Sequence, residues 1–370
     1  MALSAQAWRR PSVPELLDLP STRAEAWRWA DMGALSAAAA LAPIARAEHE
    51  EHFLDLPGAR LLFVNGVLDE VHSVLDRVTL IEHVAGDHAL GRHAQGTGWS
   101  LRLDTDAAAD PVQVVHVATG GENHLPAEIV LADDAVATVV ETFVGAGWSN
   151  RATRIALGRS ARLQRSVRLL QAGGFVSLRE EAELGSGASL VSVFLGAGQA
   201  GSRIDGQVVV GEGGYAEMGG ALLTAGQQRQ ECAVRVRHAE PNGQSHQLWR
   251  AVAADTSVAS LAAAVEVARH AQKTDGEQSL RGLLLQRTAT VNLKPELEIF
   301  ADDVKCAHGA TVGELDTRAL FYMQSRGIPK PRAQAILTRA FVADALDRIA
   351  SEPVREAFAA DADAWLDGAL

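Results

Sequence analysis

The 370-residue sequence has few cysteines, few aromatic residues and no long apolar run. Its two cysteines, Cys232 and Cys306, are too few for a disulfide framework or a four-thiolate metal site within one chain. No apolar stretch approaches the roughly 18 residues of a membrane-spanning helix, and the first residues lack the pattern of a signal peptide. These absences predict a cytoplasmic protein without a membrane partner.

Basic residues are also scarce, with 34 Lys and Arg against 46 Asp and Glu and a net charge of −12. Nucleic acids and anionic membranes are bound by clustered Lys and Arg, so we expect neither partner. The sequence lacks a G-x-x-x-x-G-K-[ST] loop. A G-x-G-x-x-G stretch at Gly196–Gly201 precedes a strand-like segment rather than a helix, so it offers no helix N-terminus to a pyrophosphate. We therefore expect no nucleotide bound by this chain.

Short apolar segments recur at a nearly constant spacing in the middle of the chain. A nine-residue unit, in which apolar and polar residues alternate on both sides of a tight corner, occurs four times in succession. The small residues at these corners are spaced 26, 27 and 26 residues apart: Ala132, Gly158, Gly185 and Gly211. A weaker fifth unit begins at Leu283. The alternative is chance recurrence, since Ala and Gly are common here.

Such a unit cannot bury its apolar row alone, but stacked units can. The predicted fold is therefore mainly β: a right-handed β-helix-like solenoid core over residues 96–313, flanked by helical regions. We expect Leu131, Leu157, Leu184 and Val210 to form one inward-facing ladder, because each occupies the same phase of its unit.

The flanking regions have different patterns. Residues 1–95 are expected to be helical or mixed, with a helix start at Ser21 or Thr22 and a hairpin turn at Asn65-Gly66. Residues 314–370 predict three helices that begin near Asp316, Pro329 and Pro353, the last of them more exposed. These helices could serve only as a lid on the open end of the solenoid, or as a module that docks a partner.

Reactive residue types converge at Phe300–Gly309. Cys306 and His308 are two residues apart, so in a strand they point to the same side. Lys305 would favour the thiolate modestly. Two ligands are too few for an iron or zinc site, so the remaining ligands would come from another chain or from sulfide. The alternative is an ordinary buried cysteine and a surface histidine without a role.

The segments 294–313 and 319–328 closely resemble the C-terminal signature of the SufB/SufD family of the SUF iron–sulfur cluster assembly system. Residues 272–278 resemble the coil that precedes it. Gly309 stands where SufB chains carry Glu, which favours the SufD branch. The resemblance implies a non-enzymatic scaffold subunit that pairs with SufB, docks the ATPase SufC and helps to build the nascent cluster at the interface with SufB.

The resemblance also implies roles for particular residues. His308 corresponds to the family's functional histidine and is the candidate iron ligand, shared with the partner chain, while Cys306 lies at the same cluster-assembly interface. The SufC contacts correspond to residues 314–350. We expect the edge around Leu297–Val304 to pair with SufB, or with a second copy in a homodimer when the chain is isolated. The only cofactor expected here is a transient iron–sulfur cluster, and the resemblance leaves open whether the complex binds flavin.

Three other functions are compatible with a β-helix. The chain could be a SufB-type paralogue that acts as the main scaffold, or a β-helix interaction protein without a metal role. A carbohydrate-active enzyme would need paired carboxylates and an aromatic platform. The aromatic content of 5% disfavours this last class.

Overall fold

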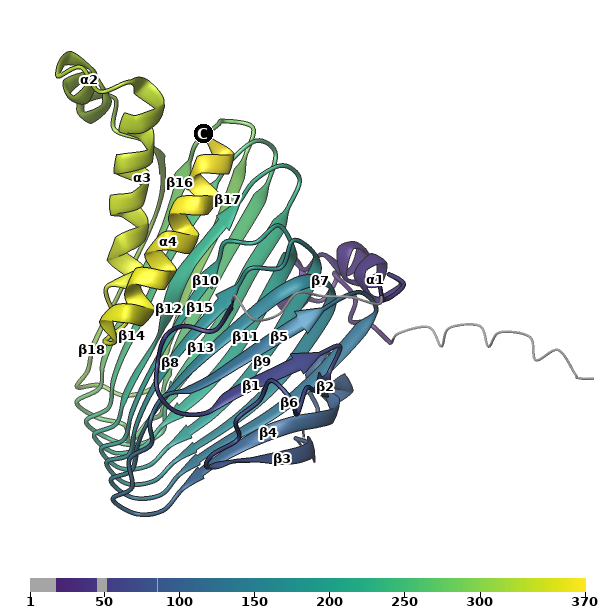
Figure 1. Cartoon of the computed structure of the whole chain (residues 1–370). Helices are drawn as coiled ribbons and strands as arrows, with labels where there is room; N and C mark the ends of the chain where they lie inside the picture. Colours follow the sequence, from purple (N-terminus) through teal and green to yellow (C-terminus); the bar gives the residue numbers. More distant parts are fainter. Residues whose placement is uncertain (1–17, 45–51, 85) are drawn as a thin grey trace, which may run out of the picture.

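The computed structural model describes residues 18–44, 52–84 and 86–370. The predicted β-helix core is confirmed: two largely parallel sheets are wound as successive coils, with helices near both ends of the chain (Figure 1). The predicted strand after Gly201 is also confirmed, because Gly201 begins β11. Residues 1–17 and 45–51 of the predicted N-terminal helical region lie outside the described residues.

Successive coils contribute one strand to each sheet, and β7 bends at a corner to take part in both. Sheet A consists of β1 (Arg60–Val64), β2 (Val67–Leu68), β5 (Val112–Ala118), the first part of β7 (Val136–Leu157), β8 (Arg162–Leu169), β10 (Ser189–Gly196), β12 (Tyr215–Thr224), β14 (Gln244–Ala253), β16 (Asp275–Leu284) and β18 (Lys305–Glu314). Sheet B consists of β3 (Val78–His83), β4 (Gln95–Leu103), β6 (Glu122–Leu131), the second part of β7, β9 (Gly173–Leu184), β11 (Gly201–Val210), β13 (Arg229–His238), β15 (Val258–Val267) and β17 (Thr290–Ile299).

The predicted ladder is confirmed. Leu131 pairs with Leu157, Leu157 with Leu184, and Leu184 with Val210, and all four side chains are buried. The same ladder continues to His238 and then to Val267, at spacings that widen to 28 and 29 residues. The corners lengthen in this half of the solenoid, which explains why a search at a fixed period stops at Val210.

The fifth unit of the predicted repeat lies at a different corner. Leu283 is in β16 of sheet A and Val291 is in β17 of sheet B, so this unit runs from sheet A to sheet B. The other four units run from sheet B to sheet A, as Leu131 and Ala137 illustrate. The corner from sheet A to sheet B and the corner from sheet B to sheet A both need small or polar residues beside apolar strands. The sequence pattern therefore did not distinguish the two kinds of corner.

The N-terminal region contains less helix than expected. The hairpin is confirmed, since Asn65 and Gly66 have φ values of 50° and 77° between β1 and β2. The helix start predicted at Ser21 or Thr22 is wrong, because residues after it form only a 3-10 turn, η1 (Glu25–Trp27). Helix α1 (Met32–Ala39) begins after Asp31, whose side chain accepts a hydrogen bond from Ala34 N. A second 3-10 turn, η3 (Gly91–His93), precedes β4. Strands β1–β3 lie before residue 96, so the stacked sheets begin inside this region.

The C-terminal helices lie along the solenoid and do not close its end (Figure 1). They are α2 (Thr317–Ser325), α3 (Lys330–Leu346) and α4 (Glu352–Ala369). Leu346 and Phe358 belong to an apolar cluster with Leu195 and Leu223 from the outer face of sheet A. The interpretation of these helices as a lid is therefore wrong, and α4 is less exposed than expected because one face is buried.

Two arginines of sheet A hold this helical pair in place. The guanidinium of Arg168 makes a two-point contact with the carboxylate of Asp361, at 2.6 and 2.9 Å. Arg250 Nε donates to Asp344 Oδ2 at 2.9 Å. Helix α2 has no buried residue and extends away from the sheets at the far end of α3 (Figure 1).

Candidate functional site

Cys306 and His308 lie on β18, the last strand of sheet A. Within the described chain β18 pairs with β16 alone among the sheet A strands, and β17 ends sheet B in the same way. The last coil therefore presents two strand edges whose backbone N–H and C=O groups are open to pairing. Both residues are at the end of the solenoid where a further coil or a partner could stack.

The two side chains occupy inward-facing positions of this coil. Their register partners on β16 are Gly276 and Gln278, both buried in the solenoid interior. Side chains of paired residues in a parallel sheet point to the same face. Cys306 and His308 thus stand where earlier coils have core residues, but no coil built from the described residues covers them, and His308 is exposed.

The environment of Cys306 disfavours its thiolate. Burial raises the pKa of the Cys306 thiol, the backbone N–H of Gly276 acts in the opposite direction, and the charge of Asp275 raises the pKa further. Lys305 does not supply the expected thiolate stabilisation, so that expectation is wrong: the Cys306 pKa is set by burial, the Gly276 N–H and Asp275. The cost of ionising Cys306 leaves the imidazole of His308 as the stronger candidate ligand of the pair.

A row of buried amides continues inward from His308. Gln247 on β14 pairs in register with Gln278, which pairs with His308. The Nε2 groups of both glutamines reach across the interior and donate to carbonyls of sheet B, from Gln247 to Ala264 O at 2.9 Å and from Gln278 to Glu296 O at 3.3 Å. The Oε1 atom of each has no hydrogen-bond partner among the described residues. Sequence reasoning missed this row, although glutamine at a core phase of two consecutive coils was its signal.

A second polar group is enclosed nearer the N-terminal end of the solenoid. Arg165 Nη2 donates to Glu141 Oε1 at 2.7 Å, and the other arm of Arg165 contacts Glu180. Arg151 Nη2 lies 2.7 Å from Glu141 Oε2, and all four side chains are buried. Burial by itself would raise the pKa of Glu141, but Arg151 and Arg165 outweigh it and hold that pKa well below its usual range. For Glu180 burial prevails over Arg165 and raises the pKa.

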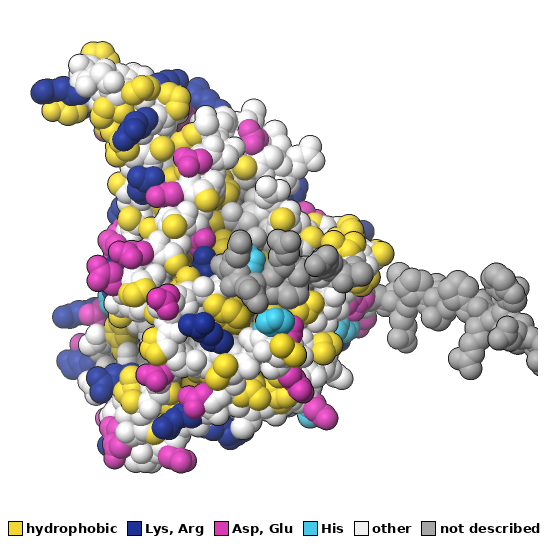
Figure 2. Space-filling model, viewed as in Figure 1, with side chains coloured by type: hydrophobic (Ala, Val, Ile, Leu, Met, Phe, Trp, Pro, Cys, Tyr) yellow, Lys and Arg dark blue, Asp and Glu magenta, His cyan; other side chains and the backbone are white. Residues whose placement is uncertain are grey.

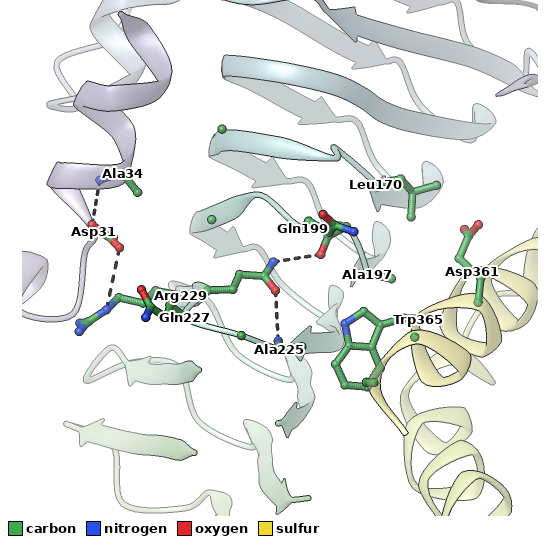
Figure 3. A pocket seen from close by; sticks show the side chains of 18 residues that line it. Asp31, Ala34, Leu170, Ala197, Gln199, Ala225, Gln227, Arg229, Asp361 and Trp365 are labelled. Carbon is green, nitrogen blue, oxygen red and sulfur yellow. Dashed lines mark hydrogen bonds and ion pairs between the residues drawn. The ribbon is translucent and has the colours of Figure 1, made fainter. Parts of the chain in front are cut away.

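A cavity of about 690 Å³ opens between α1, the corners after β10 and β12, and the end of α4 (Figure 3). The Gly196–Gly201 stretch contributes to its lining, but the backbone N–H groups of residues 197–200 are bonded to the carbonyls of Leu169 and Gln171. Asp31 and Asp361 add negative charge, and Arg229 lies 3.9 Å from Asp31. The cavity is therefore poorly suited to a phosphate.

Over residues 18–44, 52–84 and 86–370, no group of three or more His, Cys, Asp and Glu side chains could hold a metal ion. Cys306 and His308 would need ligands from elsewhere to complete a site. No helix in that part of the chain has the length and apolar character needed to cross a membrane.

The comparison with known proteins agrees with this architecture. Residues 116–341, which include the inward-facing rows, β18 and most of α3, match the family model described as "SUF system FeS cluster assembly, SufBD core domain". The match covers more than half of the chain. The chain belongs to the SufBD family of the SUF iron–sulfur cluster assembly system.

Individual relatives point to the SufD branch of this family. The chain is similar to the iron–sulfur cluster assembly protein SufD of Escherichia coli, with 42% identity over 112 residues, which is 30% of this chain and 26% of that protein. It is 32% identical to the chloroplastic protein ABCI7 of Arabidopsis thaliana over 231 residues, 59% of this chain and 48% of that protein. SufD of Bacillus subtilis is 28% identical over 146 residues, 40% and 33% of the two chains. These matches span at most about half the length of each relative.

Proposed function

We propose that this chain is a non-catalytic scaffold subunit that pairs with SufB through its open solenoid end and docks the ATPase SufC through its C-terminal helices. The observation that carries the proposal is the last coil, which places Cys306 and His308 at core positions that the described residues of this chain leave partly open. In this proposal the nascent cluster is built at the interface with SufB and leaves it again, so it is cargo rather than a resident group.

Strand addition at the last coil supports the pairing with SufB. Ile299, Phe300 and Val312 are exposed apolar residues on or beside β17 and β18. A partner strand would pair with the open edges and bury these side chains. Pro295 on β17 is compatible with an edge position. The same edges would join two copies of this chain when SufB is absent.

The surface of α2 and the adjoining part of α3 supports docking of a second partner. Phe321 and Tyr322 are 73% and 59% exposed on α2, with Arg318 on the same helix and Arg326 directly after it. Figure 2 shows basic and apolar side chains together on this projection. Residues 317–343 carry five basic and no acidic residues, although the whole chain has a net charge of −12. An acidic groove with apolar pockets, as expected on SufC, would complement this surface.

His308 would supply the ligand on this side of the interface. An imidazole is neutral for a large fraction of molecules near pH 7 and can offer a nitrogen lone pair to iron without first losing a proton. Cys306 must ionise, which its burial opposes. The other ligands would come from SufB and from sulfide, while nucleotide chemistry would belong to SufC.

The test is co-expression of the chain with SufB and SufC, followed by measurement of iron and acid-labile sulfide in the purified complex. We expect His308→Ala to lose most of the iron and sulfide while the three subunits still co-purify. His270→Ala is the matched control, because His270 is an exposed histidine at a corner between coils. A His308→Ala complex that loads like the unaltered one would contradict the proposal, as would loading by this chain without SufB.

Docking of SufC is tested by replacing two side chains on α2. Ending the chain at Gly313 would also remove α3 and α4, which cover an apolar face of sheet A, so loss of binding would follow from misfolding alone. Phe321→Ser combined with Tyr322→Ser alters an exposed surface only. We expect this double variant to retain SufB and lose SufC in a pull-down, whereas retention of SufC would exclude α2 as its contact.

A further inference from the structure

Gln278 is a polar side chain at a core position, and its hydrogen bonds are incomplete. It is 1% exposed, its Nε2 donates to Glu296 O, and its Oε1 has no partner in the described part of the chain. A buried acceptor without a partner is destabilising. An apolar residue here would avoid that loss, as Leu280 does two residues later. The position therefore calls for an explanation beyond packing.

The orientation of the Gln278 amide follows from its neighbour. The atom that faces Glu296 O must be the Nε2 donor, because two carbonyl oxygens would repel each other. The other end of the amide is then an acceptor held in a defined direction. His308 is the register partner of Gln278, and adjacent strands lie about 4.8 Å apart. His308 thus lies on the adjacent strand with its side chain on the same inward face as this oxygen, and its ring carries an N–H that could donate to it.

We propose that Gln278 is a positioning residue for His308. Its Oε1 accepts the hydrogen of one imidazole nitrogen, which fixes the tautomer and turns the lone pair of the other nitrogen toward the open end of the solenoid. Histidines that bind metals commonly donate their second ring N–H to such a partner. This inference rests on the proposed function, because the nitrogen lone pair that points outward would bind iron of the cluster under assembly.

The direct test is the tautomer of His308 in the full chain labelled with ¹⁵N-histidine. Spectra recorded near pH 8.5, above the usual imidazole pKa of about 6.5, report which nitrogen carries the hydrogen. His308→Ala identifies the resonances. We expect a single tautomer in the unaltered chain, and a mixture of both in Gln278→Met, which keeps a similar volume without an acceptor.

Gln247→Met is the matched control, since Gln247 has the same burial and the same bond across the interior but lies two coils away from His308. It should leave the His308 resonances unchanged. A tautomer mixture in the unaltered chain would overturn the proposal without any variant, and so would a Gln278→Met chain with unchanged His308 nitrogen shifts.

Cluster loading separates this inference from the proposed function. In the complex with SufB and SufC, we expect Gln278→Met to reduce bound iron and sulfide about tenfold, as is typical for loss of a partner of a metal-bound histidine. If Gln278→Met shifts the tautomer but His308→Ala loads normally, the positioning contact is supported and the proposed function fails. If His308→Ala abolishes loading and Gln278→Met leaves the tautomer unchanged, the inference alone is overturned.

Discussion

The solenoid contains two polar interiors that differ in how their groups are paired. Near β7, β8 and β9, the charges of Glu141, Arg151, Arg165 and Glu180 are paired with one another inside the core. Near the last coil, Gln247 and Gln278 are neutral, bond to the backbone and leave one acceptor each without a partner. The first group carries formal charges held in ion pairs, although Arg151 Nε and Arg165 Nε have no partner among the described residues, and it is a matter of stability. The second continues to the exposed His308, which we propose as an iron ligand.

Removing one member of the charged group should have the largest effect on the free energy of unfolding. Arg165→Met leaves Glu141 and Glu180 buried without the cation that lies between them. Loss of one partner from a buried ion pair costs about 3–5 kcal/mol. We expect the free energy of unfolding in urea to fall by that amount.

Two control variants show whether the loss of stability in Arg165→Met is specific to the buried charges. Arg162→Met changes an arginine of the same strand on its exposed face, and it should alter stability by less than about 0.5 kcal/mol. Gln247→Met removes one hydrogen bond in the other interior and should cost about 1 kcal/mol. If Arg165→Met and Gln247→Met lowered the free energy of unfolding equally, the charged interior would contribute no more to stability than the amide interior, which would contradict our expectation.

His238 provides a pH-dependent comparison within the second half of the solenoid. It replaces the aliphatic residue in the ladder between Val210 and Val267, and its Nε2 lies 2.8 Å from Ser245 Oγ. Burial lowers the pKa of His238 to about 4. The unfolded chain therefore binds a proton near pH 6.5 that the folded chain resists, so stability is complete above about pH 6.5 and declines as the pH falls toward 4.

The expected decline due to His238 is about 3 kcal/mol across that window. In His238→Leu, urea unfolding at pH 7 and at pH 4.5 should differ by less than in the unaltered chain. Burial also lowers the pKa of His116, so part of the pH dependence will persist. An unchanged difference between the two pH values in His238→Leu would contradict the burial argument.

Much of the fold could be predicted because the repeat is local. Alternation on both sides of small corner residues identified the ladder from Leu131 to Val210, and Asn65-Gly66 identified the hairpin. The widening of the period after Val210 could not be predicted, because a longer corner is tolerated at the surface without a sequence signature. The docking of α3 and α4 on sheet A depends on contacts between residues far apart in sequence, such as Arg168 and Asp361.

The candidate site was only partly predictable. The spacing of Cys306 and His308 predicted that both side chains share a face, and their register with Gly276 and Gln278 places both inward. The role that we propose for Gln278 depends on which strand lies beside β18, and strand order across a coil of about 30 residues is not visible in one segment. The expected influence of Lys305 rested on its being next to Cys306 in the sequence, but the charge that acts on the Cys306 pKa is that of Asp275, which belongs to the neighbouring strand.

The smallest expected effect concerns the reactivity of the Cys306 thiol. Cys232 is buried and burial raises its pKa, so alkylation of the folded chain should report Cys306 alone. Asp275 lies beside Lys305 in the register, and its charge raises the pKa of Cys306. Asp275→Asn should therefore speed iodoacetamide labelling at pH 7.5 by about two- to threefold, because the thiolate is the reactive form. Lys305→Met should leave the rate unchanged within about 1.5-fold, because burial, the Gly276 N–H and Asp275 set the Cys306 pKa and Lys305 does not contribute. A large decrease in Lys305→Met would restore the electrostatic role that the sequence first indicated, and would make Cys306 a stronger candidate ligand beside His308.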